Sequence, residues 1–196
     1  MEANGKIPLT LGFADLSDND FAALIAEDST ALSPLFERVR VAPARNIPSA
    51  EILFVYTHLN ENGTIRGSDR SGIRQVAQLT KSALVVVASP NSAASIKNAA
   101  GIPGPKTANI VFTADRNGQA FATFFHSLFD KMRNGENMLS AWVDWRLKAL
   151  SQPTPICPWS CSWPRRGKLH FPNPARHGLM DRTRPHITFP RQVRSP

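Results

Sequence analysis

The sequence predicts an α/β domain in which helices cover both faces of a mainly parallel sheet, a three-layer sandwich. Two observations lead to this prediction. Short apolar runs without a polar interruption, of which 83–89 is the clearest, are typical of strands buried on both faces. Segments in which apolar residues recur at helical spacing lie between these runs, and strands that alternate with helices favour parallel pairing.

Five strands are expected, at 9–13, 36–41, 52–58, 83–89 and 109–114. The segment 52–58 begins with four successive apolar residues, which again indicates burial on both faces. The segment 36–41 instead alternates apolar and charged residues, the pattern of a half-exposed or edge strand.

The helices are expected between and after these strands, at 21–26, 71–81, 92–100 and 119–144. The last is the clearest, because phenylalanines recur along it at three- and four-residue spacing and form a wide apolar face. Asn134 and Gly135 should break it into two pieces. The prediction is therefore one α/β domain over 1–144.

Charge separates this domain from the rest of the chain. Residues 145–196 hold ten of the 23 Lys and Arg but one of the 15 Asp and Glu. Their net charge is therefore +9, while that of 1–144 is −1. A basic segment with interleaved aromatic residues is a candidate for nucleic-acid binding. This prediction holds only if residues 145–196 are the true sequence of the protein.

The segment 145–167 has neither helical nor strand periodicity, and its text resembles a shifted reading frame. When 145–167 is back-translated with permitted codons, one missing base before Trp145 lets the DNA read LAPQGPEPADADMPMELLVAEAG. One extra base near Gly167 then restores the printed frame at Lys168. The alternative reading ends in a strand-like run, MELLVAEAGKLHF. The other interpretation is a genuine Pro/Arg-rich tail, which such a composition predicts to be disordered.

No metal or cofactor is expected. Cys157 and Cys161 have a three-residue spacer, and His170 and His177 follow at distances that fit zinc-binding spacings poorly. Neither glycine-rich phosphate-binding motif occurs in the chain.

Candidate catalytic residues lie where predicted strands end. His58 and Ser89 stand at the ends of successive strands, and Ser92 follows shortly after, so a histidine base with a serine nucleophile is one hypothesis. The other interpretation is a hydrogen-bonded histidine and a helix-capping Ser92. Asn91, Arg66 and Asp69 belong to the same strand-end loops, where Arg66 and Asp69 are most simply solvent-exposed charges.

The order of these parts resembles the caspase-like fold, and more closely its bacterial CHAT branch, over about 50–144. There, one strand ends in Gly-His-Gly and the next in Ser-Ala-Cys. Thr57-His58-Leu59 and Ser89-Pro90-Asn91 stand in those places here. The resemblance implies a caspase-like sheet, for which a flavodoxin-like order is the alternative. It also implies His58 without the nucleophilic cysteine, whose place Asn91 takes.

The functional prediction is a non-catalytic interaction or regulatory module with a protein partner. The alternatives are a hydrolase that uses His58 with Ser89 or Ser92, and nucleic-acid binding through the tail. No run of about 18 apolar residues occurs and the N-terminus has no signal-peptide pattern, so no membrane association and a cytoplasmic location are expected.

Overall fold

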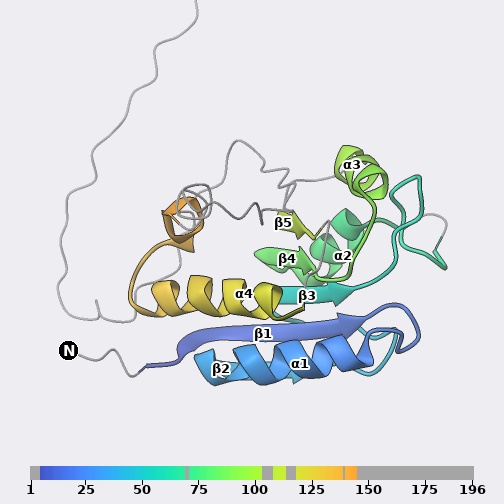
Figure 1. Ribbon diagram of the computed structural model, residues 1–196. Coiled ribbons are helices and arrows are strands. Elements are labelled where there is room, and N and C mark those ends of the chain that lie inside the picture. The colour runs from blue at the N-terminus through green and yellow to red at the C-terminus, as the bar shows by residue number, and fades with distance from the viewer. Residues whose placement is uncertain (1–4, 69–70, 103–107, 114–117, 139, 145–196) are drawn as a thin grey trace, which may run out of the picture.

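The structure of the protein is a computed structural model of the whole chain (Figure 1). It describes residues 5–68, 71–102, 108–113, 118–138 and 140–144. Asp69 and the tail 145–196, including the segment 145–167 with its two interpretations, lie outside the described residues.

The chain forms the predicted α/β fold. Its strands are β1 (Ile7–Asp15), β2 (Phe36–Val41), β3 (Ile52–Tyr56), β4 (Leu84–Val87) and β5 (Asn109–Phe112). Its helices are α1 (Ala22–Leu32), the short 3₁₀ helix η1 (Ser33–Leu35), α2 (Ile73–Thr80), α3 (Ala93–Gly101) and α4 (Gly118–Arg133). Every predicted strand is confirmed, and each boundary lies within two residues of its expected position.

The five strands pair in the order β2-β1-β3-β4-β5, and every pairing is parallel. This is the flavodoxin-like order of doubly wound sheets. All residues of β3, β4 and β5 are buried. Their uninterrupted apolar sequences follow from this burial, because helices shield both faces of these strands from water.

Helices cover the sheet from both sides, which gives the predicted three layers (Figure 1). On one face, α4 contributes a row of phenylalanines to the core, and α1 contributes the aliphatic side chains of Ile25 and Leu32. Phe54 of β3 lies edge-on to Phe125 of α4, with 4.9 Å between the ring centroids. On the other face, α2 and α3 pack against the alternate side chains of the same strands.

The connection from β2 to β3 contains no helix and lies directly against the sheet. A methyl group on Gly12 of β1 would come within 2.7 Å of the Ala50 Cβ and 3.1 Å of Pro48. Glycine at position 12 therefore allows the loop to approach the strand closely.

The long aromatic helix ends where the sequence predicts its break. Gly135 follows α4 with a φ of +93°, and its N–H donates to the Met132 carbonyl oxygen. The chain is helical again at residues 138 and 140–144. Among the described residues, no helix is both long and apolar enough to cross a bilayer.

Candidate functional site

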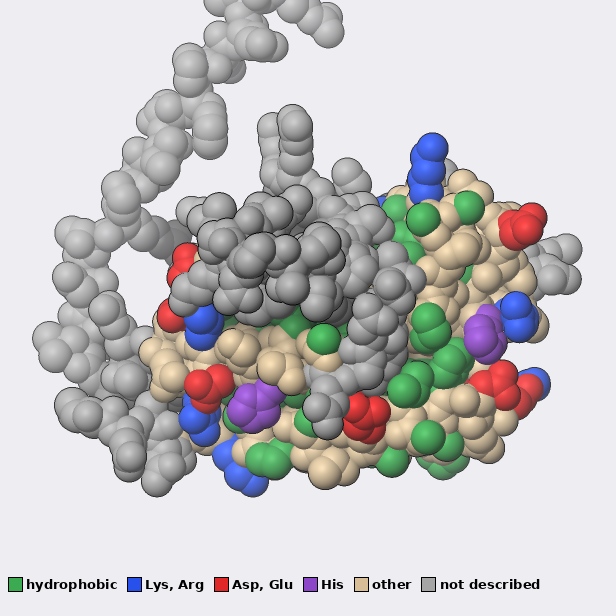
Figure 2. All heavy atoms as spheres, in the orientation of Figure 1, with side chains coloured by type: hydrophobic (Ala, Val, Ile, Leu, Met, Phe, Trp, Pro, Cys, Tyr) green, Lys and Arg blue, Asp and Glu red, His purple; other side chains and the backbone are tan. Residues whose placement is uncertain are grey.

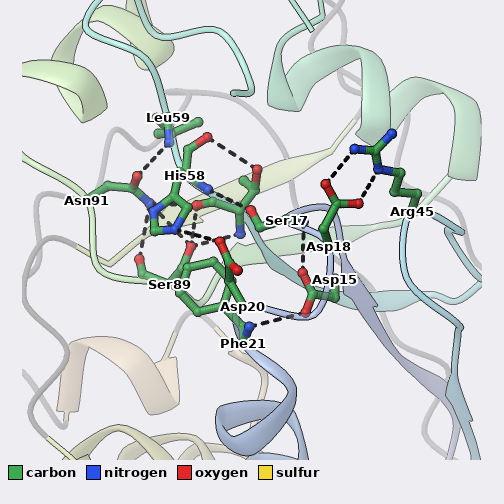
Figure 3. A network of polar contacts seen from close by, with 11 residues as sticks. Asp15, Ser17, Asp18, Asp20, Phe21, Arg45, His58, Leu59, Ser89 and Asn91 are labelled. Carbon is green, nitrogen blue, oxygen red and sulfur yellow. Dashed lines mark hydrogen bonds and ion pairs between the residues drawn. The ribbon is translucent and has the colours of Figure 1, made fainter. Parts of the chain in front are cut away.

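The candidate site lies at the carboxyl ends of β1, β3 and β4 (Figure 3). In the observed strand order, the chain reverses its direction of winding between β1 and β3. The helix after β1 covers one face of the sheet and the helix after β3 covers the other. Ligands of doubly wound sheets bind where such loops diverge, so the side chains at this point are the first to consider.

Ser89 joins the ends of β3 and β4. Its Oγ accepts a hydrogen bond from the Thr57 N–H at 2.9 Å and donates one to the Thr57 carbonyl oxygen. The side chain is buried, with 0% of the residue exposed. The last residue pair of β3 and β4 is Val55 with Val87. Beyond that pair, the Ser89 hydroxyl binds the backbone N–H and carbonyl groups of Thr57 in place of a backbone partner.

Asn91 continues this connection one step further from the sheet. Its Oδ1 accepts the Leu59 N–H at 2.7 Å, and its Nδ2 lies 3.2 Å from the Thr57 and Ser89 carbonyl oxygens. Both ends of the amide are thus bound to backbone groups. Asn91 takes the place of the cysteine in the predicted caspase-like resemblance. Its side chain connects the loop after β4 to the loop after β3.

Ser92 caps α3. Its Oγ accepts a hydrogen bond from the Ser95 N–H at 3.1 Å and donates one to the Ser95 Oγ at 2.9 Å. A serine at the N-cap satisfies one of the free N–H groups in the first turn of a helix. The interpretation of Ser92 as a capping residue is confirmed.

His58 faces the loop between β1 and α1 instead of the two serines. Its Nε2 lies 3.5 Å from the Asp20 Oδ2, its ring centroid lies 4.7 Å from that of Phe21, and its backbone N–H donates to the Ser17 Oγ at 3.2 Å. Within the described part of the chain, no hydrogen bond joins His58 to Ser89 or Ser92. The three candidate catalytic residues share one edge of the sheet but form no dyad.

Asp15, which the sequence analysis does not single out, organises the loop between β1 and α1. Its carboxylate accepts the N–H of Ser17 at 2.8 Å and the N–H of Phe21 at 3.2 Å. Only 3% of the residue is exposed. An acidic residue at the end of an apolar strand, seven positions before the first residue of the helix, is the sequence signal that could have identified this role.

A second contact fixes the same loop from outside. Arg45, in the connection between β2 and β3, donates a bidentate pair of hydrogen bonds to the Asp18 carboxylate. These hydrogen bonds hold the pKa of Asp18 below its ordinary value and raise the pKa of Arg45. Asp18, Asn19 and Arg45 all have positive φ angles, a backbone state that is uncommon outside glycine.

Arg66 is part of the strand-end loop but binds there only through its backbone. Its N–H donates to the His58 carbonyl oxygen at 2.8 Å. The guanidinium forms no hydrogen bond or ion pair within the described residues, and the side chain is exposed. The edge where β1 and β3 end thus presents a histidine beside acidic and basic side chains (Figure 2).

No protein-family model and no curated protein matches this chain. The resemblance to the caspase-like clan therefore remains a prediction that rests on the residues quoted for it.

No metal cluster lies at this edge in the part of the chain that the structure describes. No three metal-ligating side chains come together among those residues. A groove of about 500 Å³ lies elsewhere, between α1 and α4, and its lining residues are Glu27, Ala31, Ala122, Thr123, His126 and Ser127.

Proposed function

We propose that this protein is a non-catalytic interaction or regulatory module whose partner is another protein. The observation that carries the proposal is that the side chains of Ser89 and Asn91 form structural hydrogen bonds to the backbone. Both follow the carboxyl end of β4, where a sheet of this type places reactive groups, and Asn91 takes the place of the cysteine in the family that the sequence resembles. The polar atoms of both side chains form hydrogen bonds with the backbone of the loop that follows β3.

A serine nucleophile needs an exposed hydroxyl with a base within hydrogen-bond reach. Ser89 is fully buried, and its hydroxyl already donates to the Thr57 carbonyl oxygen. Asn91 offers an amide, which does not attack a carbonyl as a thiolate does. His58 is paired with Asp20 and is not directed at either group. These contacts favour a structural role for the strand ends.

The surface around the strand ends favours recognition of a partner. The Asp18–Arg45 pair is mostly exposed, and Asp20 and the Arg66 guanidinium also face solvent. Charged groups held on rigid loops at the carboxyl edge supply orientation and selectivity in protein association. Arg66 is the residue we would alter first, because its guanidinium has no intramolecular partner among the described residues.

Reaction with a fluorophosphonate probe tests the absence of catalysis. We expect no labelling of the folded protein, and no difference between wild type and the His58→Ala, Ser89→Ala or Ser92→Ala variants. Labelling of the wild type that disappears with His58→Ala and with one of the two serine variants would instead establish a serine hydrolase, the alternative function.

Affinity capture with a matched pair of variants tests the interaction. We expect a partner protein to be recovered by the wild type and by Glu37→Lys, an exposed charge on the distant strand β2. The same partner should be lost with Arg66→Glu. Recovery that is equal for all three chains would contradict recognition at the strand-end edge.

Nucleic acid is the second candidate partner, favoured only by the charge of 145–196. Phosphate binding of this kind weakens steeply with salt. Filter binding of a DNA duplex at two salt concentrations, with and without that segment, measures it.

A further inference from the structure

The strand β5 is built as an interior strand, although it lies at an edge of the described sheet. It pairs with β4 on one side, and no described residue pairs with its other side. Yet its apolar residues Ile110, Val111 and Phe112 are all buried, at 9% exposure or less. An apolar edge strand is a template for another chain, and proteins normally protect such an edge.

The opposite edge shows how this protein protects an edge strand. Glu37, Arg38 and Arg40 of β2 are exposed, and the two arginines donate to the Pro8 and Ser49 carbonyl oxygens across the strand. Charged side chains of this kind discourage pairing with a second chain. β5 has no charged side chain. The two edges therefore differ as expected if β2 is a permanent edge of the sheet and β5 pairs with a further strand.

We propose that the natural chain completes the sheet with a sixth strand beside β5, and that the segment 145–167 of the printed sequence is the region of this strand read in a shifted frame. The occupant is the run MELLVAEAGKLHF, produced when one base is restored before Trp145 and one is removed near Gly167. Its Leu-Leu-Val-Ala core has the uninterrupted apolar character of β3 and β4, as a strand between helices requires.

The corrected reading also removes the composition that is most unusual for a domain of this type. Residues 145–167 hold both cysteines, three of the four tryptophans and four Lys and Arg. The alternative reading contains none of these residues and five acidic ones. A chain that continues from the helical residues 140–144 then has a strand to place at the open edge.

Peptide mapping of the protein purified from its natural source tests the reading. The alternative segment contains no Lys or Arg, so trypsin should release one peptide from Asn134 through Lys168 that contains LAPQGPEPADADMPMELLVAEAG. The intact protein should also give no reaction with a thiol reagent. A peptide from Asn134 to Arg146, together with two titratable thiols, would overturn the proposal.

Amide exchange in the corrected chain tests the pairing. The amides of β5 should exchange as slowly as those of β4, while outward amides of β2 exchange faster. Proline in place of the valine in Leu-Leu-Val-Ala should speed exchange in β5 by about tenfold or more and leave β2 unchanged. If β5 is unaffected by that proline, the run is not its partner, and a second copy or another protein occupies the edge.

Discussion

The side-chain amide of Asn91 binds the backbone N–H of Leu59 at 2.7 Å, and so joins the loop after β4 to the loop after β3. Leu59 is buried, so its N–H depends on this acceptor within the protein. The contact gives Asn91 a structural role at the strand end that needs no nucleophilic chemistry. It makes the stability of the site depend on the length and polarity of one side chain.

Replacing Asn91 with alanine should therefore destabilise the protein. The Leu59 N–H would be left without a partner, which costs about 1–3 kcal/mol in the free energy of unfolding. Urea denaturation followed by circular dichroism measures the loss. Asn46→Ala is the matched control, because Asn46 is exposed and its side chain makes no hydrogen bond among the described residues. Equal stability of the two variants would refute a structural role for Asn91.

Ser92 provides a separate test of the capping interpretation. Ser92→Ala should lower the free energy of unfolding by about 0.5–2 kcal/mol, because the Ser95 N–H loses its acceptor. Ser92→Asp should retain most of the stability, since an aspartate caps equally well and its charge is favourable at a helix N-terminus. If the Ser92 hydroxyl served catalysis alone, Ser92→Ala would not lower the stability and Ser92→Asp would have no loss to restore. Thermal unfolding of the three chains distinguishes the two roles.

Much of the fold could be predicted from the sequence because burial leaves a strong pattern. The apolar runs within β3, β4 and β5 have one physical explanation, shielding on both faces. The break after α4 was visible as Asn134-Gly135. What the pattern could not give was the order of the strands, since pairing depends on how loops cross the sheet. The direct approach of 48–50 to Gly12, without a helix, had no signal of its own.

The site was predicted less well, because hydrogen bonds between loops depend on directions that a sequence does not encode. His58, Ser89 and Ser92 were correctly placed at one edge of the sheet. Their side chains, however, point to Asp20, to Thr57 and into α3, respectively. The ion pair between Arg45 and Asp18 joins residues that lie 27 positions apart in the sequence. Both residues, and Asn19 between them, have positive φ angles. No periodicity or motif predicts such a contact.

Gly12 should be intolerant of any side chain. Gly12→Ala places a Cβ 2.7 Å from the Ala50 Cβ, so either the loop or the strand must move, at about 1–3 kcal/mol in the free energy of unfolding. Gly101→Ala is the control, since a methyl group added there, at the end of α3, would meet nothing within 4 Å. That change should be neutral or slightly stabilising, because alanine is the better helix former. Chemical denaturation of both variants tests the difference.

The Asp18–Arg45 pair should make the loop between β1 and α1 sensitive to acid. Because the folded protein lowers the pKa of Asp18, the pair stabilises the fold above the ordinary aspartate pKa and loses this effect as the pH falls through the lowered value. Arg45→Gln should return the pKa of Asp18 toward its ordinary value, which an NMR titration of the carboxyl carbon would measure. Added salt should produce part of the same shift in the wild type, because both side chains are exposed to solvent. An Asp18 titration that is identical in wild type and Arg45→Gln would show that the pair does not persist in solution.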